Sequence, residues 1–126
     1  MTDLDDIKVK FDLYKQTSLE NPGLREEFED MAMLDMSFIG QIVLTDVNTK
    51  LWLSFKDGKL DHGEGDVENP SLTFTTTLAI FKGIILGEVL IATAHEDGDI
   101  TFGGESEALM DFQAITSIIN EFLQHS

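Results

Sequence analysis

Residues 51–60 read LWLSFKDGKL and carry the clearest structural signal in the chain. The first half of this stretch alternates apolar with more polar side chains, which is the pattern of a strand with one buried face. Asp57 and Gly58 then form a pair that is strongly typical of a two-residue β-hairpin turn. We therefore expect residues 59–65 to return as the partner strand.

Further strands are expected on both sides of this hairpin. Residues 38–45 are rich in strand-forming side chains, and residues 47–49 (Val-Asn-Thr) make a natural turn into the hairpin. Residues 71–76 resume the alternation after the break at residues 68–70 (Glu-Asn-Pro), and residues 99–103 form another short strand. The middle of the chain is thus predicted to be an antiparallel meander.

The strongest helical pattern covers residues 105–123, where apolar side chains recur at intervals of three and four residues. The stripe that is expected to pack on the sheet consists of Ala108, Phe112, Ile115, Ile119 and Phe122. A second apolar stripe, on another face of the helix, consists of Met110, Ala114 and Ile118. Because this second stripe has no obvious partner in a single-layer α+β fold, it either lines a cavity or meets another chain.

Two helices are expected before the strands. Residues 3–17 fit helical spacing, with Thr2 in a capping position, although part of the segment also alternates as a strand does. We favour the helix. Asn21 and Pro22 are suited to be the cap and the first residue of the next helix.

The segment of residues 77–94 is almost wholly apolar. A helix that is apolar all round must be buried or must line something apolar. Gly83 and Gly87 are expected to break this segment into short pieces. With Glu88 inside it, its most apolar part is too short and too polar to span a membrane.

Composition indicates one folded domain, residues 1–126, of which 42% are hydrophobic. The 8 basic and 24 acidic residues give a net charge of −16, which argues against nucleic acid and against a basic patch for membrane docking. Residues 60–126 carry 12 acidic residues and a single basic one, Lys82. Without cysteine, and without a secretory or peroxisomal signal at either end, the chain is expected to be cytoplasmic. A monomer or weak dimer is expected.

No catalytic or metal site stands out from the residue spacing. The three histidines, His62, His95 and His125, lack the spacing of metal ligands, and each is expected to be solvated. Glu88 interrupts the apolar segment and is the one candidate for an acid or base in an apolar pocket, but we expect it to face solvent. We therefore predict a protein without enzymatic activity, catalytic residue, metal or cofactor.

Several short motifs, taken in order, resemble the sterol carrier protein type 2 domain. Residues 52–59 are similar to that family's strand, tight turn and returning strand, and residues 69–75 to its strand that opens on a proline. Residues 77–95 occupy the place of its middle helices. Residues 98–105 are similar to its last strand, and the resemblance extends over about residues 22–123.

The resemblance implies an α+β fold in which helices cover one face of a five-stranded antiparallel sheet, with an apolar tunnel between sheet and helices. It also implies binding, and possible transfer or presentation, of a sterol, fatty acid, acyl-CoA or other lipid. Two alternatives stay open, a small enzyme acting on an apolar thioester or ketone and a dimerising sensor module. The side chains expected to contact the ligand are Phe55, Phe74, Phe81, Ile84, Ile85, Leu90, Phe102, Leu109, Met110, Phe112 and Ile118.

The last strand departs from the family pattern. Where relatives often carry lysines, this chain has Asp99, Thr101 and Gly103, and Glu105 takes the last acidic position. A positive clamp for the phosphates of CoA is therefore not expected.

Overall fold

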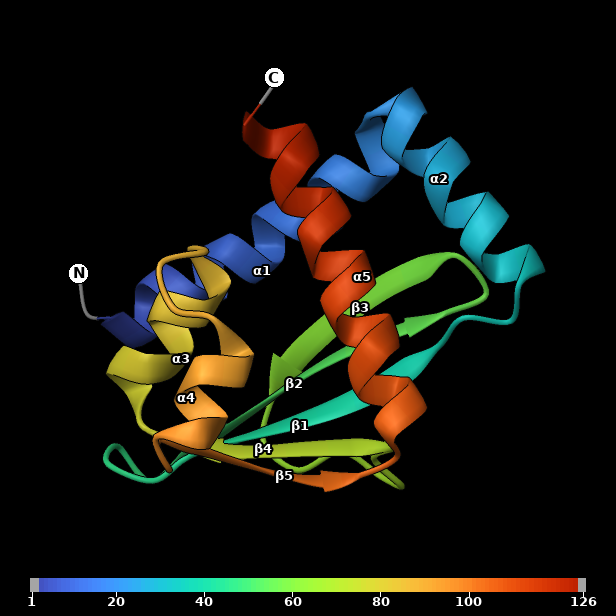
Figure 1. Cartoon of the computed structure of the whole chain (residues 1–126). Helices are drawn as coiled ribbons and strands as arrows, with labels where there is room; N and C mark the ends of the chain where they lie inside the picture. Colours follow the sequence, from blue (N-terminus) through green and yellow to red (C-terminus); the bar gives the residue numbers. More distant parts are fainter. Residues whose placement is uncertain (1–2, 125–126) are drawn as a thin grey trace.

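The strands form a single five-stranded sheet, and the helices lie on one of its faces (Figure 1). This arrangement confirms the predicted α+β class. The computed structural model describes residues 3–124, so Thr2 and His125 lie outside the described residues. The elements in chain order are α1 (Asp3–Glu20), α2 (Pro22–Met33), β1 (Phe38–Leu44), β2 (Thr49–Lys56), β3 (Lys59–Glu64), β4 (Leu72–Thr76), α3 (Leu78–Ile85), α4 (Ile91–Glu96), β5 (Ile100–Gly104) and α5 (Ser106–Gln124).

The predicted hairpin joins β2 to β3 through Asp57 and Gly58. Both residues have positive φ, 54° and 79°, as the mirror-image turns of two-residue hairpins require. Lys56 and Lys59 then face each other as the first cross-strand pair. The prediction made from the Asp-Gly pair is confirmed.

The sheet is mixed, so the prediction of a purely antiparallel sheet is wrong. Its strand order is β3-β2-β1-β4-β5. β1 and β4 run parallel, with Gly40 opposite Leu72, whereas the other three neighbouring pairs are antiparallel. Alternation of apolar and polar side chains assigns residues to faces but does not encode strand direction, so it could not predict this pairing.

Gln41 holds the connection that makes the parallel pairing possible. The chain leaves β3 at one edge of the sheet and has to pass β2 and β1 before it enters β4. Gln41 faces away from the helices, because it alternates with the helix-facing residues of β1. Its side-chain nitrogen donates to Leu51 O and Gly65 O, both at 2.9 Å, and its oxygen accepts from Val67 N–H at 2.8 Å. This buried polar side chain fixes the crossover against the face of the sheet opposite the helices.

The N-terminal segment is helical, which resolves the ambiguity of residues 3–17 in favour of the helix. The buried face of α1 consists of Ile7, Phe11, Tyr14 and Ser18. Asn21 caps α2 as expected, because its side-chain oxygen accepts the Leu24 N–H at 3.1 Å and Pro22 is the first residue of the helix.

The core lies between the sheet and the helices. The predicted core-facing stripe of α5 is confirmed for four buried residues, Ala108, Phe112, Ile115 and Ile119, whereas Phe122 is only partly buried. The Phe112 ring contacts Phe38 and Phe74, with centroids 5.3 and 4.8 Å apart. Burial of each such side chain contributes about 1.5–3 kcal/mol to folding, so α5 and the sheet hold each other in place.

Candidate functional site

The turn between α3 and α4 borders one wall of a groove in the helical layer. Gly87, with φ of 76°, ends the first helical piece as predicted. Gly83 lies inside α3, so the prediction that it breaks the helix is wrong. A β-carbon at Gly83 would lie 2.5 Å from Val89 Cγ2. Because that β-carbon is missing, Val89 can fold back over α3, and Gly83 O accepts the Glu88 and Val89 N–H groups at 2.8 and 3.0 Å.

A groove with a volume of about 360 Å³ runs between this turn and α5. One wall is apolar and belongs to the α3–α4 segment, which we define as residues 78–96. The other wall is the polar side of α5. The lining residues are Ile84, Gly87, Val89, Leu90, Ile91, Gln113, Thr116, Ser117, Asn120, Glu121 and Gln124.

A polar contact joins three helices beside this groove. The Tyr14 hydroxyl, on α1, lies 2.8 Å from Asn120 Oδ1 on α5 and 3.2 Å from Ile85 O at the end of α3. Asn120 Nδ2 lies 3.5 Å from the same Ile85 O. Burial raises the pKa of Tyr14 far above its usual value, against the opposing effect of the hydrogen bond to Asn120. Tyr14 is therefore a neutral hydrogen-bond donor that fixes the Asn120 amide at the groove.

Most of the aromatic residues predicted to contact a ligand are buried in the core. Phe74 lies at the centre of these rings, with centroids 4.8 Å from Phe112, 5.3 Å from Phe102 and 6.3 Å from Phe81. Ile85 is buried as well. Phe55 is separate from this group, since it packs against Phe28 of α2 at 4.8 Å. The structure thus brings Phe74, Phe81, Phe102 and Phe112 of the predicted set together as a cluster of rings between the helices and the sheet.

The remaining predicted residues lie nearer the surface. Ile84 and Leu90 line the groove, and Leu90 is 71% exposed. Ile118 lines a second hollow of about 340 Å³ together with Glu27, Glu121 and Phe122. Leu109 is half-buried against the core, and Met110 is 67% exposed.

The polar wall of the groove was not predicted from the sequence. Its α5 residues recur at intervals of three and four, which places them on one side of the helix. They form a third stripe, polar and almost uncharged, between the two apolar ones. A polar, almost uncharged stripe between two apolar ones is the sequence signal that could have pointed to the site. The stripe consists of Gln113, Thr116, Ser117, Asn120, Glu121 and Gln124.

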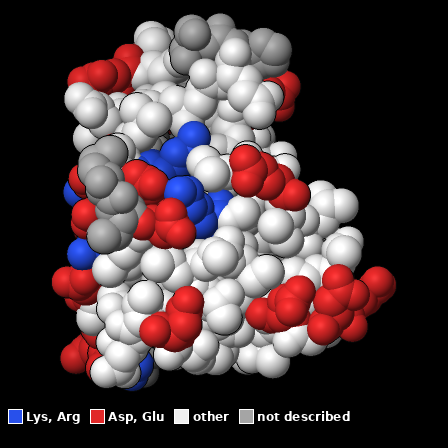
Figure 2. Space-filling view, turned by 90° about the vertical axis from the view of Figure 1, so that its left-hand side faces the viewer, with Lys and Arg blue, Asp and Glu red and all other residues white. Residues whose placement is uncertain are grey.

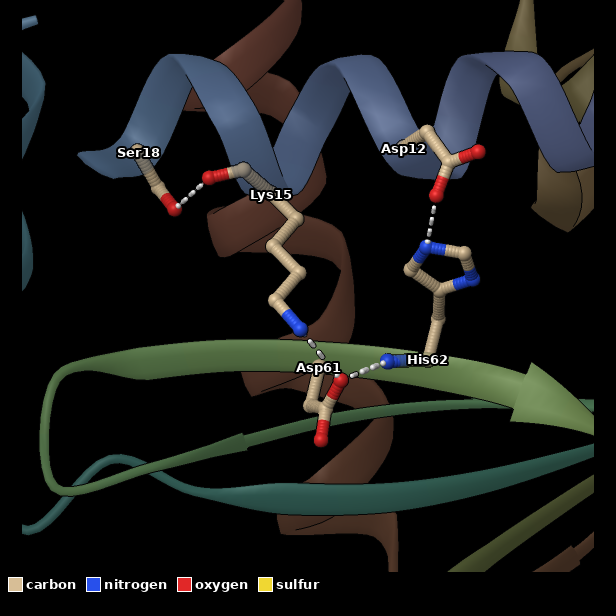
Figure 3. A network of polar contacts seen from close by, with 5 residues as sticks. All are labelled: Asp12, Lys15, Ser18, Asp61 and His62. Carbon is tan, nitrogen blue, oxygen red and sulfur yellow. Dashed lines mark hydrogen bonds and ion pairs between the residues drawn. The ribbon is translucent and has the colours of Figure 1, made fainter. Parts of the chain in front are cut away.

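On the opposite side of the helical layer, ionic contacts join α1 to β3 at the surface (Figure 3). Lys15 Nζ lies 3.0 Å from Asp61 Oδ1, and nearby Lys8 Nζ lies 2.8 Å from Glu64 Oε1. The hydrogen bond from Lys15 lowers the pKa of Asp61. These contacts tie the first helix to the edge strand of the sheet.

His62 takes part in the same contacts between α1 and β3, so the expectation that it is solvated is wrong. Its Nε2 lies 2.7 Å from Asp12 Oδ1, and its backbone N–H donates to Asp61 Oδ1 at 2.9 Å (Figure 3). The ring also makes an edge contact with Phe11, with centroids 5.8 Å apart. Only 16% of its side-chain surface is exposed. His95 is exposed, as expected.

Carboxylates lie outside the core. Glu88 is exposed, as expected, and no Asp or Glu of residues 3–124 is buried. Within the same residues, no group of three or more His, Asp or Glu side chains is arranged to hold a metal ion. No helix in this described part of the chain has both the length and the apolar character to cross a membrane.

The surface around α3 and α4 carries little charge. Figure 2 looks at this side of the molecule and shows a broad uncharged area with carboxylates toward its margins. Lys82 Nζ, on α3, lies 2.9 Å from both Asp3 Oδ1 and Asp6 Oδ2 of α1. These hydrogen bonds raise the pKa of Lys82. The one basic residue of the second half of the chain is therefore held by carboxylates away from the groove.

Solved structures with a similar fold include two proteins of comparable length. A protein described as "UbiJ-SCP2 Ubiquinone synthesis protein" has 12% identity and a TM-score of 0.64, with 86% of each chain covered. Sterol carrier protein 2 from Yarrowia lipolytica has 14% identity and a TM-score of 0.59, over 79% of this chain and 87% of that one.

A much larger protein also contains a similar part. The match to the sec-alkylsulfatase Pisa1 from Pseudomonas sp. has 18% identity and a TM-score of 0.57, over 70% of this chain. The chain spans only 15% of the length of that enzyme. At these identities the likeness concerns the fold alone.

Comparison with protein families gives the more specific result. A comparison with curated proteins returned no match. The model of the SCP-2 sterol transfer family matches residues 24–117, which include every strand and most of the groove. This match covers well over half of the chain and agrees with the mixed sheet and the one-sided helical layer. The chain therefore belongs to the SCP-2 sterol transfer family.

Proposed function

We propose that this protein binds a hydrophobic ligand of the lipid class and presents or transfers it. The observation that carries the proposal is the groove between the α3–α4 segment and α5. Its volume of about 360 Å³ lies at the lower end of the range of small-molecule sites, which is roughly 300–1,000 Å³. Membership of a family described by sterol transfer supports the same class of ligand.

The apolar wall supplies the affinity in this proposal. Leu90 is 71% exposed, although it lies beside Ile84 and Val89 in the groove. A ligand that covers Leu90 removes apolar surface from water, and full burial of such a side chain is worth about 1.5–3 kcal/mol. Ile84 and Leu90 are thus the residues of the predicted set that contact the ligand first.

The apolar tunnel expected from the sequence is part of the proposal. We place its inner end at the rings of Phe74, Phe81 and Phe112. These side chains are buried and packed, so a chain that enters among them has to displace them. The groove is then the entrance, and the depth of insertion depends on the length of the ligand.

Substitution of one exposed leucine by arginine tests the proposal. Leu90→Arg places a charge on the apolar wall and should weaken lipid binding at least about ten-fold, the factor that corresponds to roughly 1.4 kcal/mol. Leu86→Arg is the matched control, because Leu86 is also exposed in the same segment but is not among the lining residues. Binding is measured by the fluorescence of Nile red, an uncharged apolar dye, and by native mass spectrometry of lipid that co-purifies.

Two results would count against the proposal, in different ways. Equal lipid binding by Leu90→Arg and Leu86→Arg would show that the groove is not the binding site. Absence of co-purified lipid, together with no binding of Nile red or of any long-chain lipid by the wild-type protein, would show that the protein does not bind lipids.

A further inference from the structure

The chemistry of the groove indicates which head group a ligand carries. None of the lining residues is Lys, Arg or His. The polar wall offers neutral amide and hydroxyl groups, and its one ionisable side chain is the acidic Glu121. An anionic head group there would lose hydration without gaining a cation, and it would lie near a like charge.

Asn120 is the polar group of the wall whose orientation is fixed. Asn120 Oδ1 accepts the Tyr14 hydroxyl at 2.8 Å, so the amide nitrogen is left as the donor on the other side. That nitrogen carries two N–H groups, and its contact with Ile85 O at 3.5 Å engages at most one of them. Because Asn120 also lines the groove, its amide is placed to donate to an oxygen of a bound molecule.

We propose that the groove selects single-chain lipids with an uncharged, oxygen-bearing head group, of the long-chain alcohol class, over fatty-acid anions and acyl-CoA. In this assignment Asn120 Nδ2 donates to the head-group oxygen, and Tyr14 is the positioning residue that holds the amide. Glu121 disfavours carboxylates and phosphates. The inference rests on the proposed function, since it names the ligand class of the same groove.

The test compares ligands that share one alkyl chain. Hexadecanol, palmitate and hexadecane are titrated against the wild-type protein loaded with Nile red, at about pH 8, where palmitate is ionised. Hexadecanol should displace the dye at a concentration at least about ten-fold lower than palmitate does, equivalent to roughly one 1.4 kcal/mol step. Displacement by palmitate at an equal or lower concentration overturns the inference but leaves the proposed function standing. If neither lipid displaces the dye, the inference fails too, and the proposed function fails with it only if the wild-type protein also binds neither Nile red nor any long-chain lipid and no lipid co-purifies.

Two variants separate the roles of the wall residues. Asn120→Leu should weaken hexadecanol up to about ten-fold, the effect of one hydrogen bond, with hexadecane unchanged. Glu121→Gln, at an exposed position where folding is little affected, should strengthen palmitate several-fold relative to hexadecanol. Asn120→Leu can also weaken the packing of α5, so the Glu121→Gln result stands as the independent measurement. An unchanged preference for hexadecanol over palmitate in Glu121→Gln would contradict the role assigned to Glu121, and unchanged hexadecanol binding in Asn120→Leu would contradict the role assigned to Asn120.

Discussion

Two regions of the helical layer cover the same core and differ in how they are closed. On the β3 side, Phe11 of α1 is buried over the sheet, and ion pairs such as Lys15–Asp61 lie outside it. On the other side, the α3–α4 segment faces the polar stripe of α5 across the groove. No ion pair between residues 3 and 124 joins these two walls, and Leu90 stays 71% exposed.

The difference shows which interactions hold a helix on the sheet in a chain with this many acidic residues. Exposed ion pairs contribute only about 0–1 kcal/mol each, so the contacts on the α1 side align the helix more than they hold it. Burial of side chains such as Phe11 supplies the larger free energy. The groove remains open because one of its walls is polar and gains little by leaving water.

The largest effect is expected for Phe11→Ala. Phe11 is 1% exposed and contacts the rings of Tyr14, His62 and Phe81, with centroids 5.8–6.3 Å apart. Truncation of a buried phenylalanine costs about 3–5 kcal/mol, so the urea midpoint should fall steeply. Leu90→Ala, on the groove side, should change the free energy of unfolding by less than about 0.5 kcal/mol.

A control on the same helix isolates the role of burial. Leu13 is 41% exposed, so Leu13→Ala should cost far less than Phe11→Ala, although both variants gain helix propensity. Similar losses in Phe11→Ala and Leu90→Ala would show that the two sides are closed in the same way, and the comparison would fail.

Tyr14→Phe tests the point where the two regions meet. The hydroxyl joins α1 to α5 and to the end of α3, so its loss leaves Asn120 Oδ1 and Ile85 O without this donor. The expected cost is about 1–3 kcal/mol. Urea unfolding at neutral pH measures it.

The same variant predicts how stability depends on pH. Burial raises the pKa of Tyr14 in the folded protein, whereas in the unfolded chain this group titrates near its usual value of about 10. Its contribution to stability is therefore complete below about pH 10 and declines as the pH rises above that value. The difference in the free energy of unfolding between wild type and Tyr14→Phe should therefore be smaller at about pH 11 than at about pH 8. Lysines titrate in both proteins, so their effect on stability cancels in this difference. A difference that grows with pH would contradict the burial of a neutral phenol.

Local features made most of the fold predictable from the sequence. Alternation, the Asp57-Gly58 turn and the Asn21 cap each depend on neighbouring residues, and all appear in the structure. The parallel pairing of β1 with β4 was not predictable, because it brings together residues such as Gly40 and Leu72 that are far apart in the sequence, as does the contact of Gln41 with Val67, 26 positions away. For this reason the sequence did not predict that β4 runs parallel to β1.

The site was predictable only in part, for a similar reason. The predicted ligand contacts Ile84 and Leu90 line the groove, but the same apolar pattern describes the buried Phe74 and Phe112 equally well. Apolar character alone does not separate a ligand contact from a core contact. The hydrogen bond between Tyr14 and Asn120 spans 106 positions, so no local pattern indicated it.

Only a small loss of stability is expected for Lys15→Gln, and its size decides whether ion pairs or apolar burial hold α1 to the sheet. The Lys15 and Asp61 side chains are 44% and 57% exposed, so the loss should stay below about 1 kcal/mol. Lys15 lowers the pKa of Asp61, so this contribution is present above the unfolded pKa of about 3.9 and disappears as the pH falls below it.

Lys59→Gln removes an equal charge from an exposed position, so it corrects for the effect of changing the net charge of −16 by one. Urea unfolding of the two variants at neutral and acidic pH gives the difference, and a loss near that of Phe11→Ala would mean that the ion pairs hold α1 to the sheet.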